Sequence, residues 1–442
     1  MMRNILEGIF APAVMLMSRL RYWQKFVTLT ILFTIPVGFA LFSYITQIQQ
    51  RIAFAEKEII GVQYISSVLS LLQNLQQHRG MASLYLNGEE SFLPRLEEKK
   101  KNIEDNFLLI EARNQEFGKE LGTADAARSL RKKWAVLEKT FTQLTPKESA
   151  RQHTEFISEG LALIFNVSDA SNVTLDPDLD SYYLMNTVVN TLPNLSENLG
   201  QSRAFTLSVQ DPKNISDAER RDLINFIKIA RSANEKIQRD MRVAFKTNNS
   251  LEAILNEPLS AMSSSVNSLV SLLGTFVDTS KIEMSFPEYY AFSTTVIDTN
   301  FSLLASVSPA LITLLERRID GLISEQRTIT SVTAFSYILI LYFLMGFYFL
   351  VERTVREFKD IAERLIGGKE AEAHILSRDE LGDAGKSFNA VGRALQASAH
   401  ELESKVKDLE RFNKLMVNRE LKMIELKKEI EELKKKAEQY HS

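Results

Sequence analysis

Two long apolar segments without charged residues, 26–45 and 329–351, constrain this chain more than any other feature. An α-helix needs roughly 20 predominantly apolar residues to cross the hydrocarbon core of a bilayer, and each segment is long enough. We therefore expect two transmembrane helices in a lipid bilayer, with residues 46–328 on one side and both termini on the other. Two helices line no pore, so this arrangement favours a receptor over a channel.

Basic residues in the short flanks predict the orientation, because lysine and arginine there favour the cytoplasmic side. The flanks contain Arg3, Arg19, Arg21, Lys25, Arg353, Arg356 and Lys359. The loop also has basic residues near its ends, but a long loop translocates largely regardless of charge. We place residues 1–25 and the C-terminal segment in the cytoplasm. A cleaved signal peptide is the alternative for the first segment, but its apolar run is too long and no small-residue cleavage site follows.

The composition narrows the fold class. The chain has 442 residues, ten prolines, seventeen glycines and no cysteine, so disulfides and zinc-thiolate sites are excluded. Apolar residues recur at helical spacing nearly throughout, and no convincing alternating strand pattern occurs. We expect an all-α protein. The net charge of −3 predicts no bulk attraction to nucleic acid.

Capping and breaking residues divide the loop, residues 46–328, into seven or eight helices. The breaks fall at Asn87-Gly88, Ser91 with Pro94, Gly122-Thr123, Thr145-Pro146, Asp176-Pro177, Asp211-Pro212 through Ser216, Asn248 to Ser250, and Phe286-Pro287. Proline after a capping residue is typical of a helix start. The helices suffice for one long bundle or two stacked bundles. The last helix is expected to continue into the second apolar segment.

Two similar motifs each contain an arginine in a helical context: residues 75–80 read LQQHRG, and residues 199–204 read LGQSRA. A small residue near an arginine lets a neighbouring helix or a ligand approach closely. Two converging arginines can hold a small oxyanion by bidentate hydrogen bonds. Arg79 and Arg203 are therefore candidate ligand-binding residues. The alternative is that each arginine pairs with a carboxylate such as Glu197 or lies on the surface.

The segments LLQNLQQHRGMASLYLNGEESF and LDPDLDSYYLMNTVVNTLPNLSENLGQSRAF resemble the all-helical periplasmic input region of bacterial chemoreceptors and sensor kinases. They are more distantly similar to the nitrate- and nitrite-sensing domain, whose anion site uses arginines from paired bundle helices. The resemblance covers residues 10–210 well and 211–328 thinly. It implies a small-molecule ligand, with Arg79 matching the family's first-helix arginine and Arg203 matching a later one loosely. His78 stands where the family often has a second basic residue, so it joins the candidate ligand-binding residues and the identity of the anion stays open.

An acidic run, DPDLD at residues 176–180, precedes a predicted helix. It lacks the glycine and the terminal glutamate of a twelve-residue calcium loop. Acidic residues at a helix start also cap free amides and interact favourably with the helix dipole. We therefore expect helix capping and no metal site here.

After the second apolar segment, residues 352–400 resemble a HAMP linker domain over their whole length. The matching motifs are IAERLIGG, DELG and FN within ERTVREFKDIAERLIGGKEAEAHILSRDELGDAGKSFNAVGRALQ. Apolar residues at helical spacing define two short helices, and neither can bury its apolar face alone. Two copies in parallel would complete a four-helix bundle, so a homodimer is implied. The residues expected to relay a signal are Phe358, Ile361, Leu365, Glu380, Leu381 and Phe388.

Residues 401–442 have the heptad pattern of a coiled coil. One core set is Leu402, Leu409, Met416, Met423, Ile430 and Ala437, and the other is Lys405, Phe412, Arg419, Leu426, Leu433 and Tyr440. The segment is similar to the signalling helix that joins HAMP or sensory modules to an output domain. It predicts that a parallel two-stranded coil forms between two copies of the chain.

Motifs for enzymatic chemistry are missing. His400-Glu401-Leu402 begins like a histidine-kinase phosphoacceptor box, but Glu403-Ser404-Lys405 does not continue it, and 42 residues follow His400. No glycine-rich phosphate loop or catalytic triad pattern occurs. We expect no enzyme activity, no cofactor and no metal.

The sequence thus predicts a dimeric receptor in the inner membrane of a bacterium, acting on a separate cytoplasmic signalling protein such as a kinase. Two alternatives stay open. One is a truncated input half of a sensor histidine kinase or methyl-accepting chemotaxis protein. The other is a membrane scaffold without a ligand.

Overall fold

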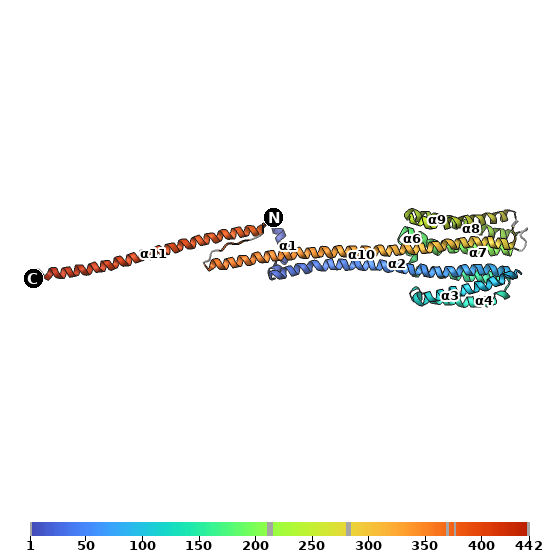
Figure 1. Cartoon of the computed structure of the whole chain (residues 1–442), viewed down its shortest axis with the longest axis horizontal. Helices are drawn as coiled ribbons and strands as arrows, with labels where there is room; N and C mark the ends of the chain where they lie inside the picture. The colour runs from blue at the N-terminus through green and yellow to red at the C-terminus, as the bar shows by residue number, and fades with distance from the viewer. Residues whose placement is uncertain (1, 210–214, 280–283, 368–370, 375–376, 440–442) are drawn as a thin grey trace. The chain divides into compact units, whose positions relative to one another are not determined.

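The computed structural model describes residues 2–209, 215–279, 284–367, 371–374 and 377–439. All regular secondary structure in these ranges is helical, as expected for an all-α chain. The chain divides into two units (Figure 1). One unit is Phe42–Ile329, and the other comprises Met1–Leu41 and Thr330–Ser442.

Eleven α-helices occur in the described ranges, and two of them, α2 and α10, contribute residues to both units. The helices are α1 (Met2–Ser18), α2 (Tyr22–Leu86), α3 (Leu93–Leu121), α4 (Ala124–Thr140), α5 (Pro146–Ala170), α6 (Leu179–Asn186), α7 (Leu192–Ser208), α8 (Asp217–Thr247), α9 (Ser250–Thr279), α10 (Phe286–Ile366) and α11 (Glu380–Gln439). A π-helical turn, Thr187–Thr191, joins α6 to α7 without a break. The expectation that the last loop helix continues into the second apolar segment is confirmed by α10.

Local sequence signals set most helix ends in the Phe42–Ile329 unit. Gly122 ends α3 in the left-handed conformation, with φ of 65°, where glycine carries no side-chain penalty. The Thr145 hydroxyl accepts a hydrogen bond from the Glu148 amide at 3.2 Å and caps α5. Ser216 and Glu219 form a capping box at the start of α8. The predicted break at 211–212 lies outside the described residues.

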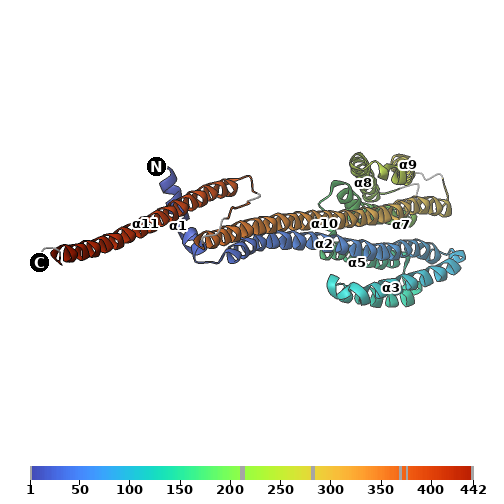
Figure 2. The same ribbon diagram turned by 60° about the vertical axis from the view of Figure 1, so that its left-hand side comes forward.

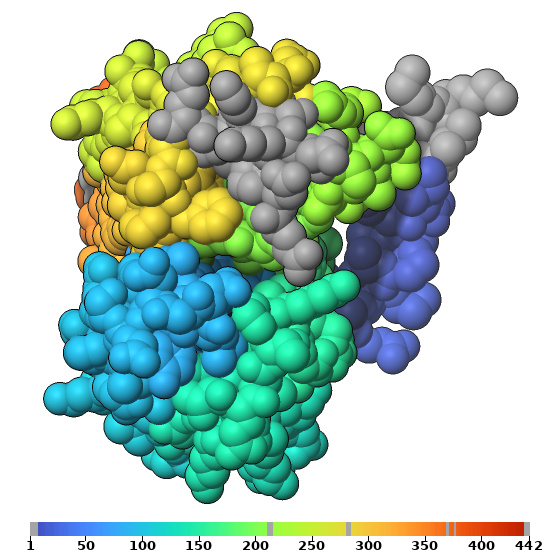
Figure 3. Space-filling model, turned by 90° about the vertical axis from the view of Figure 1, so that its right-hand side faces the viewer, coloured from blue at the N-terminus to red at the C-terminus, as the bar shows by residue number. Residues whose placement is uncertain are grey.

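The Phe42–Ile329 unit contains two helical bundles that lie side by side. Helices α2 to α5 form one, and α6 to α10 form the other (Figures 1 and 2). Seen end-on, the blue-to-teal helices of the first bundle lie against the green-to-orange helices of the second (Figure 3). One continuous hydrophobic core joins them, with Trp134 in the first bundle and Met262 in the second both fully buried. The bundles are therefore not stacked end to end, and their shared face can hold a site.

The acidic run before α6 differs in part from expectation. Asp178 occupies the N-cap position, but its carboxylate makes no capping hydrogen bond. The Asp176 carboxylate accepts the Asp178 amide at 3.0 Å, and Asp180 accepts the Ser181 amide at 2.9 Å. Asp176 and Asp178 also form ion pairs with Arg318 of α10 at 2.7 and 2.6 Å. Because a guanidinium approaches from a distant helix, tertiary pairing replaces the expected cap at Asp178.

In the other unit, the apolar parts of α2 and α10 pack against each other. These two helices are long and apolar enough to cross a membrane. Tyr22 stacks on Tyr348 with ring centroids 5.8 Å apart, and the Thr34 and Tyr337 hydroxyls hydrogen-bond. The contacts proceed in opposite directions along the two helices, so the pair is antiparallel.

In the same unit, the end of α10 and the start of α11 pack side by side and run in the same direction. The Phe358 and Phe388 ring centroids lie 5.2 Å apart. Further along both helices, Leu365 lies beside Gly392, where an added Cβ would come within 3.3 Å of it. Ala373 lies in the segment that joins α10 to α11, and the Asn389 side chain of α11 binds it. Asn389 accepts a hydrogen bond from the Ala373 amide at 2.7 Å and donates one to the Ala373 carbonyl at 3.0 Å. The contact between α10 and α11 includes three of the predicted relay residues, Phe358, Leu365 and Phe388. Glu380, another of them, is exposed.

Candidate functional site: a charged cluster between the two bundles

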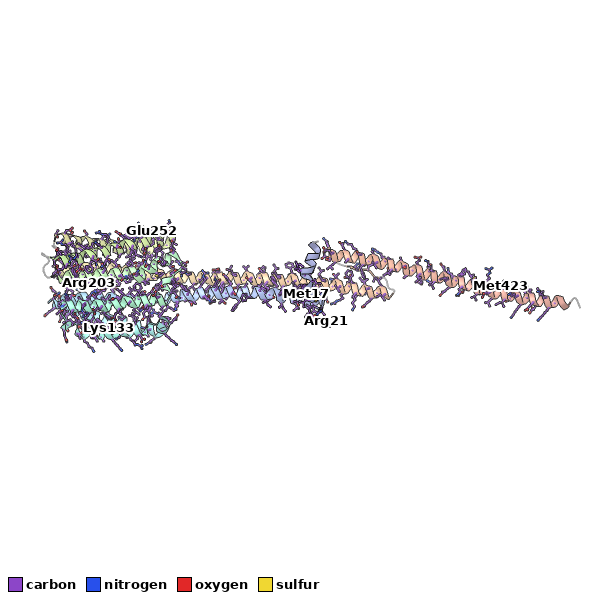
Figure 4. All side chains as sticks on the ribbon, turned by 180° about the vertical axis from the view of Figure 1, so that it is seen from behind. Met17, Arg21, Lys133, Arg203, Glu252 and Met423 are labelled. Atoms are coloured by element: carbon purple, nitrogen blue, oxygen red, sulfur yellow. The ribbon has the colours of Figure 1, made fainter. Side chains whose placement is uncertain are left out.

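The candidate site lies where α2 of the first bundle meets α7 of the second. Arg79 of α2 and Arg203 of α7 are both fully buried, and Figure 4 labels Arg203 where the two bundles meet. The π-helical turn before α7 accompanies Pro193, which has no N–H to donate to the preceding turn. Asn300 of α10 donates to the Leu192 carbonyl at 3.0 Å, so this irregular turn is anchored to its neighbour.

Arg79 is paired with a carboxylate across the interface. Its Nη1 and Nη2 donate to the two Glu197 carboxylate oxygens at 2.7 and 3.1 Å, a bidentate arrangement. Nη1 also donates to the Thr154 hydroxyl of α5 at 2.8 Å. Glu197 accepts further hydrogen bonds from Gln76 at 3.1 Å and Gln201 at 2.8 Å. The alternative weighed for Arg79, pairing with Glu197, is thus what the structure shows.

Arg203 has neutral partners. Its Nη2 donates to the Gln76 carbonyl of α2 at 2.6 Å, and its Nη1 donates to the Thr294 hydroxyl of α10 at 2.7 Å. The guanidinium carbon lies 5.1 Å from the centroid of the Tyr290 ring, within cation–π range. Among the side chains that the structure describes, no carboxylate forms an ion pair with Arg203. Burial lowers the pKa of Arg203 from its ordinary value.

Two glycines let the arginines cross the interface. A Cβ on Gly80 would lie 2.8 Å from Nη2 of Arg203, and a Cβ on Gly200 would lie 2.4 Å from Nη2 of Arg79. Each guanidinium therefore packs over the glycine of the opposite helix. The small residue beside Arg79 has the role expected of it. On α7 that role belongs to Gly200, three residues before Arg203, and not to Ala204.

Unsatisfied hydrogen-bonding groups cluster at the same place. Arg79 Nε, Arg203 Nε and the Tyr290 hydroxyl are buried and have no hydrogen-bond partner in the described structure. Buried polar groups are normally paired, and a bound ion is one explanation for those that are not. The cluster can therefore donate further hydrogen bonds to an anion.

The structure brings Arg79 and Arg203 together but places His78 with different neighbours. Successive residues of a helix point in directions about 100° apart, so His78 and Arg79 face different helices. His78 Nδ1 lies 2.8 Å from His153 Nε2, and its ring packs edge-on against Trp134 and Phe141. Burial lowers the pKa of His78 well below its usual value. Electrostatic interactions with His153 and Lys100 lower the pKa further. Burial likewise lowers the pKa of His153, to about 4.

A second buried charged cluster links α2, α10 and the start of α6. Arg318 Nη1 donates to Glu58 at 3.0 Å, in addition to its pairs with Asp176 and Asp178. Burial, and then the negative charge of Asp176, raise the pKa of Glu58 to about 8. This cluster is rich in negative charge, so it is a poor site for an anion. No group of three or more histidine, aspartate or glutamate side chains within the described ranges is placed to hold a metal ion.

Several residues of the site carried no signal in the sequence. Gln76, Thr154, Tyr290 and Thr294 are polar or aromatic residues at ordinary helical positions. They become site residues because four helices, α2, α5, α7 and α10, converge there. Gln76 lies one helical turn before Arg79, and that spacing, i and i+3, could have drawn attention to it.

Residues 70–300 match the NIT family, described as nitrate and nitrite sensing. The chain belongs to the nitrate and nitrite sensing family. The match spans both bundles and extends well beyond residue 210, where the resemblance found in the sequence was thin. The Arg79–Arg203 cluster lies within the matched residues. The matched part is therefore an input domain for sensing and signalling.

A solved structure is also similar, that of the NasR transcription antiterminator. It is 13% identical, with a TM-score of 0.48, and the match covers 81% of this chain and 98% of that chain. None of the curated proteins compared with the chain matches it.

Proposed function

We propose that this chain is a transmembrane receptor that binds nitrate or nitrite at the Arg79–Arg203 cluster, between the two bundles. The observation that carries the proposal is an excess of positive charge in the protein interior. Two fully buried guanidiniums stand against one paired carboxylate, that of Glu197. Burying an uncompensated charge is costly, so the cluster gains most from binding a small anion.

The receptor spans the inner membrane of a bacterium, with residues 46–328 in the periplasm and both termini in the cytoplasm. Helices α2 and α10 each contain cluster residues and an apolar segment, which supports transmission by helix movement. The parallel packing of the end of α10 against the start of α11 supports a HAMP domain. The heptads of α11 support a coiled coil in a homodimer. The chain has no enzyme activity and acts on a separate cytoplasmic protein such as a kinase.

The test is ligand-induced stabilisation of the full-length chain in lipid nanodiscs. A ligand that binds the folded state stabilises it by about 2.7 kcal/mol at a concentration 100 times its Kd. We expect nitrate or nitrite to raise the unfolding temperature more than chloride does at equal ionic strength. Arg203→Gln should abolish the increase because it removes the unpaired guanidinium.

The control is Arg128→Gln, which removes an arginine that is 71% exposed at its side chain on α4 and should leave the response intact. The proposal fails if neither anion stabilises the wild-type receptor, or if Arg128→Gln removes the response as completely as Arg203→Gln does.

A further inference from the structure

The charge balance of the cluster depends on one residue, Glu197. Arg79 and Arg203 contribute two positive charges, and Glu197 contributes one negative charge through its bidentate pair with Arg79. The carboxylate is also fixed by Gln76 and Gln201, and its side chain is 9% exposed. The core of the interface therefore holds an excess of one positive charge.

Other titratable groups near the cluster do not change this balance. The negative charge of Asp298 of α10 attracts the Arg203 guanidinium without forming an ion pair with it. Asp298 is partly exposed and accepts hydrogen bonds from Gln77 at 2.8 Å and Gln73 at 3.4 Å. His78 and His153 are buried, and burial lowers the pKa of each, so both are neutral near pH 7. The positive charge available to a ligand is that of Arg203, while Arg79 is already neutralised.

We propose that Glu197 sets the charge selectivity of the site, so that it accepts a monovalent oxyanion and rejects a divalent one. This inference rests on the proposed function. At this buried site, a monovalent anion brings the cluster to neutrality, whereas a divalent anion such as sulfate leaves a buried negative charge. A buried charge without a partner is strongly disfavoured, and this difference separates a monovalent from a divalent oxyanion.

The first test compares nitrate and sulfate binding to the full-length receptor in nanodiscs by calorimetric titration. Glu197→Gln raises the excess charge from one to two while keeping the side-chain shape. We expect the ratio of nitrate affinity to sulfate affinity to fall by about tenfold or more. Glu197→Asp retains the charge and should retain the preference for nitrate. A residue that only supports the fold would change both affinities together and leave the ratio unaltered.

A second pair of variants keeps the test decisive if Glu197→Gln does not fold. Arg79→Gln leaves Glu197 to neutralise Arg203, so nitrate affinity should fall. In Arg79→Gln/Glu197→Gln the excess of one charge returns, and nitrate binding with a nitrate preference should return with it.

Two results would overturn the inference: an unchanged affinity ratio in folded Glu197→Gln, or no recovery of nitrate binding in the double variant. Absence of nitrate binding to the wild-type receptor would instead refute the proposed function.

Discussion

At the scale of the residue, the site depends on glycine as much as on arginine. Gly80 and Gly200 have no side chains, so each guanidinium can lie against the opposite helix and reach its partners. Arg79 thereby meets Glu197 and Thr154, and Arg203 meets the Gln76 carbonyl and Thr294. A methyl group at either glycine would occupy space that a buried, hydrogen-bonded guanidinium already fills.

Gly200→Ala should destabilise the receptor by about 1–3 kcal/mol, because its Cβ would overlap Nη2 of Arg79. It should also remove stabilisation by nitrate. The matched control is Gly274→Ala in α9, where an added Cβ meets nothing within 4 Å and should stabilise the helix by up to about 1 kcal/mol. Unfolding of both variants in nanodiscs, with and without nitrate, measures the effects. Equal stability changes in the two variants would contradict the packing described here.

At the scale of the element, α11 carries a row of apolar residues that this chain alone does not cover. Leu402, Leu409 and Leu433 are each more than 60% exposed, and Met423 (Figure 4) is 55% exposed. These residues belong to the two predicted heptad sets, whose last members, Ala437 and Tyr440, have no described side chains. Exposed apolar heptads on a long helix are typical of a coiled coil whose partner is a second helix. A homodimer remains the prediction for this element.

Single cysteines test the heptad in a chain that has no native cysteine. Met416→Cys, Met423→Cys and Ile430→Cys should form disulfides between two copies readily, because first-core positions of a parallel coil face their counterparts. Lys422→Cys and Glu429→Cys lie off that seam and should cross-link several-fold more slowly. The fraction of dimer on non-reducing gels, followed over time, gives the rates. Similar rates at all five positions would exclude this register.

At the scale of the whole molecule, the proposed signal travels from the cluster to α11 through α10 and through the contact between the end of α10 and the start of α11. Helix α10 runs from Phe286 to Ile366 without interruption, and α11 begins at Glu380. The capping hydrogen bond at that start comes from Asp379, whose carboxylate accepts the Leu381 amide at 3.0 Å. Asp379 stands at the residue before the helix, where a short side chain reaches the first free amides.

Asp379→Ala should therefore weaken the start of α11, because it removes the cap of the Leu381 amide, and shift the resting state of the receptor. In a Met416→Cys background, the rate of cross-linking should change both with and without nitrate, while nitrate affinity stays the same. Glu380→Ala in the same background is the control and should have the smaller effect. The relay from α10 to α11 is refuted if Asp379→Ala leaves the cross-linking rate unaltered both with and without nitrate.

Helix boundaries were predictable from the sequence to the extent that their signals are local. Gly122, Thr145 and Ser216 act through atoms within a few residues along the chain, so their effect does not depend on the rest of the fold. Asp178 shows the limit of this reasoning. Its carboxylate bonds Arg318, which lies 140 positions further along the chain, and no local rule contains that partner.

The sequence by itself determined the helical class, most helix ends, the two apolar segments, and the place of a small residue beside Arg79. Only the tertiary structure decided that two bundles lie side by side, that Arg79 takes the Glu197 carboxylate as its partner, and that Arg203 has neutral partners instead of a carboxylate. It also separated His78 from the arginines. The physical reason is that helix formation depends on neighbours one or two turns away, whereas a charged cluster depends on which helices pack together. That packing is settled by the whole hydrophobic core, and residues more than a hundred positions apart meet through it.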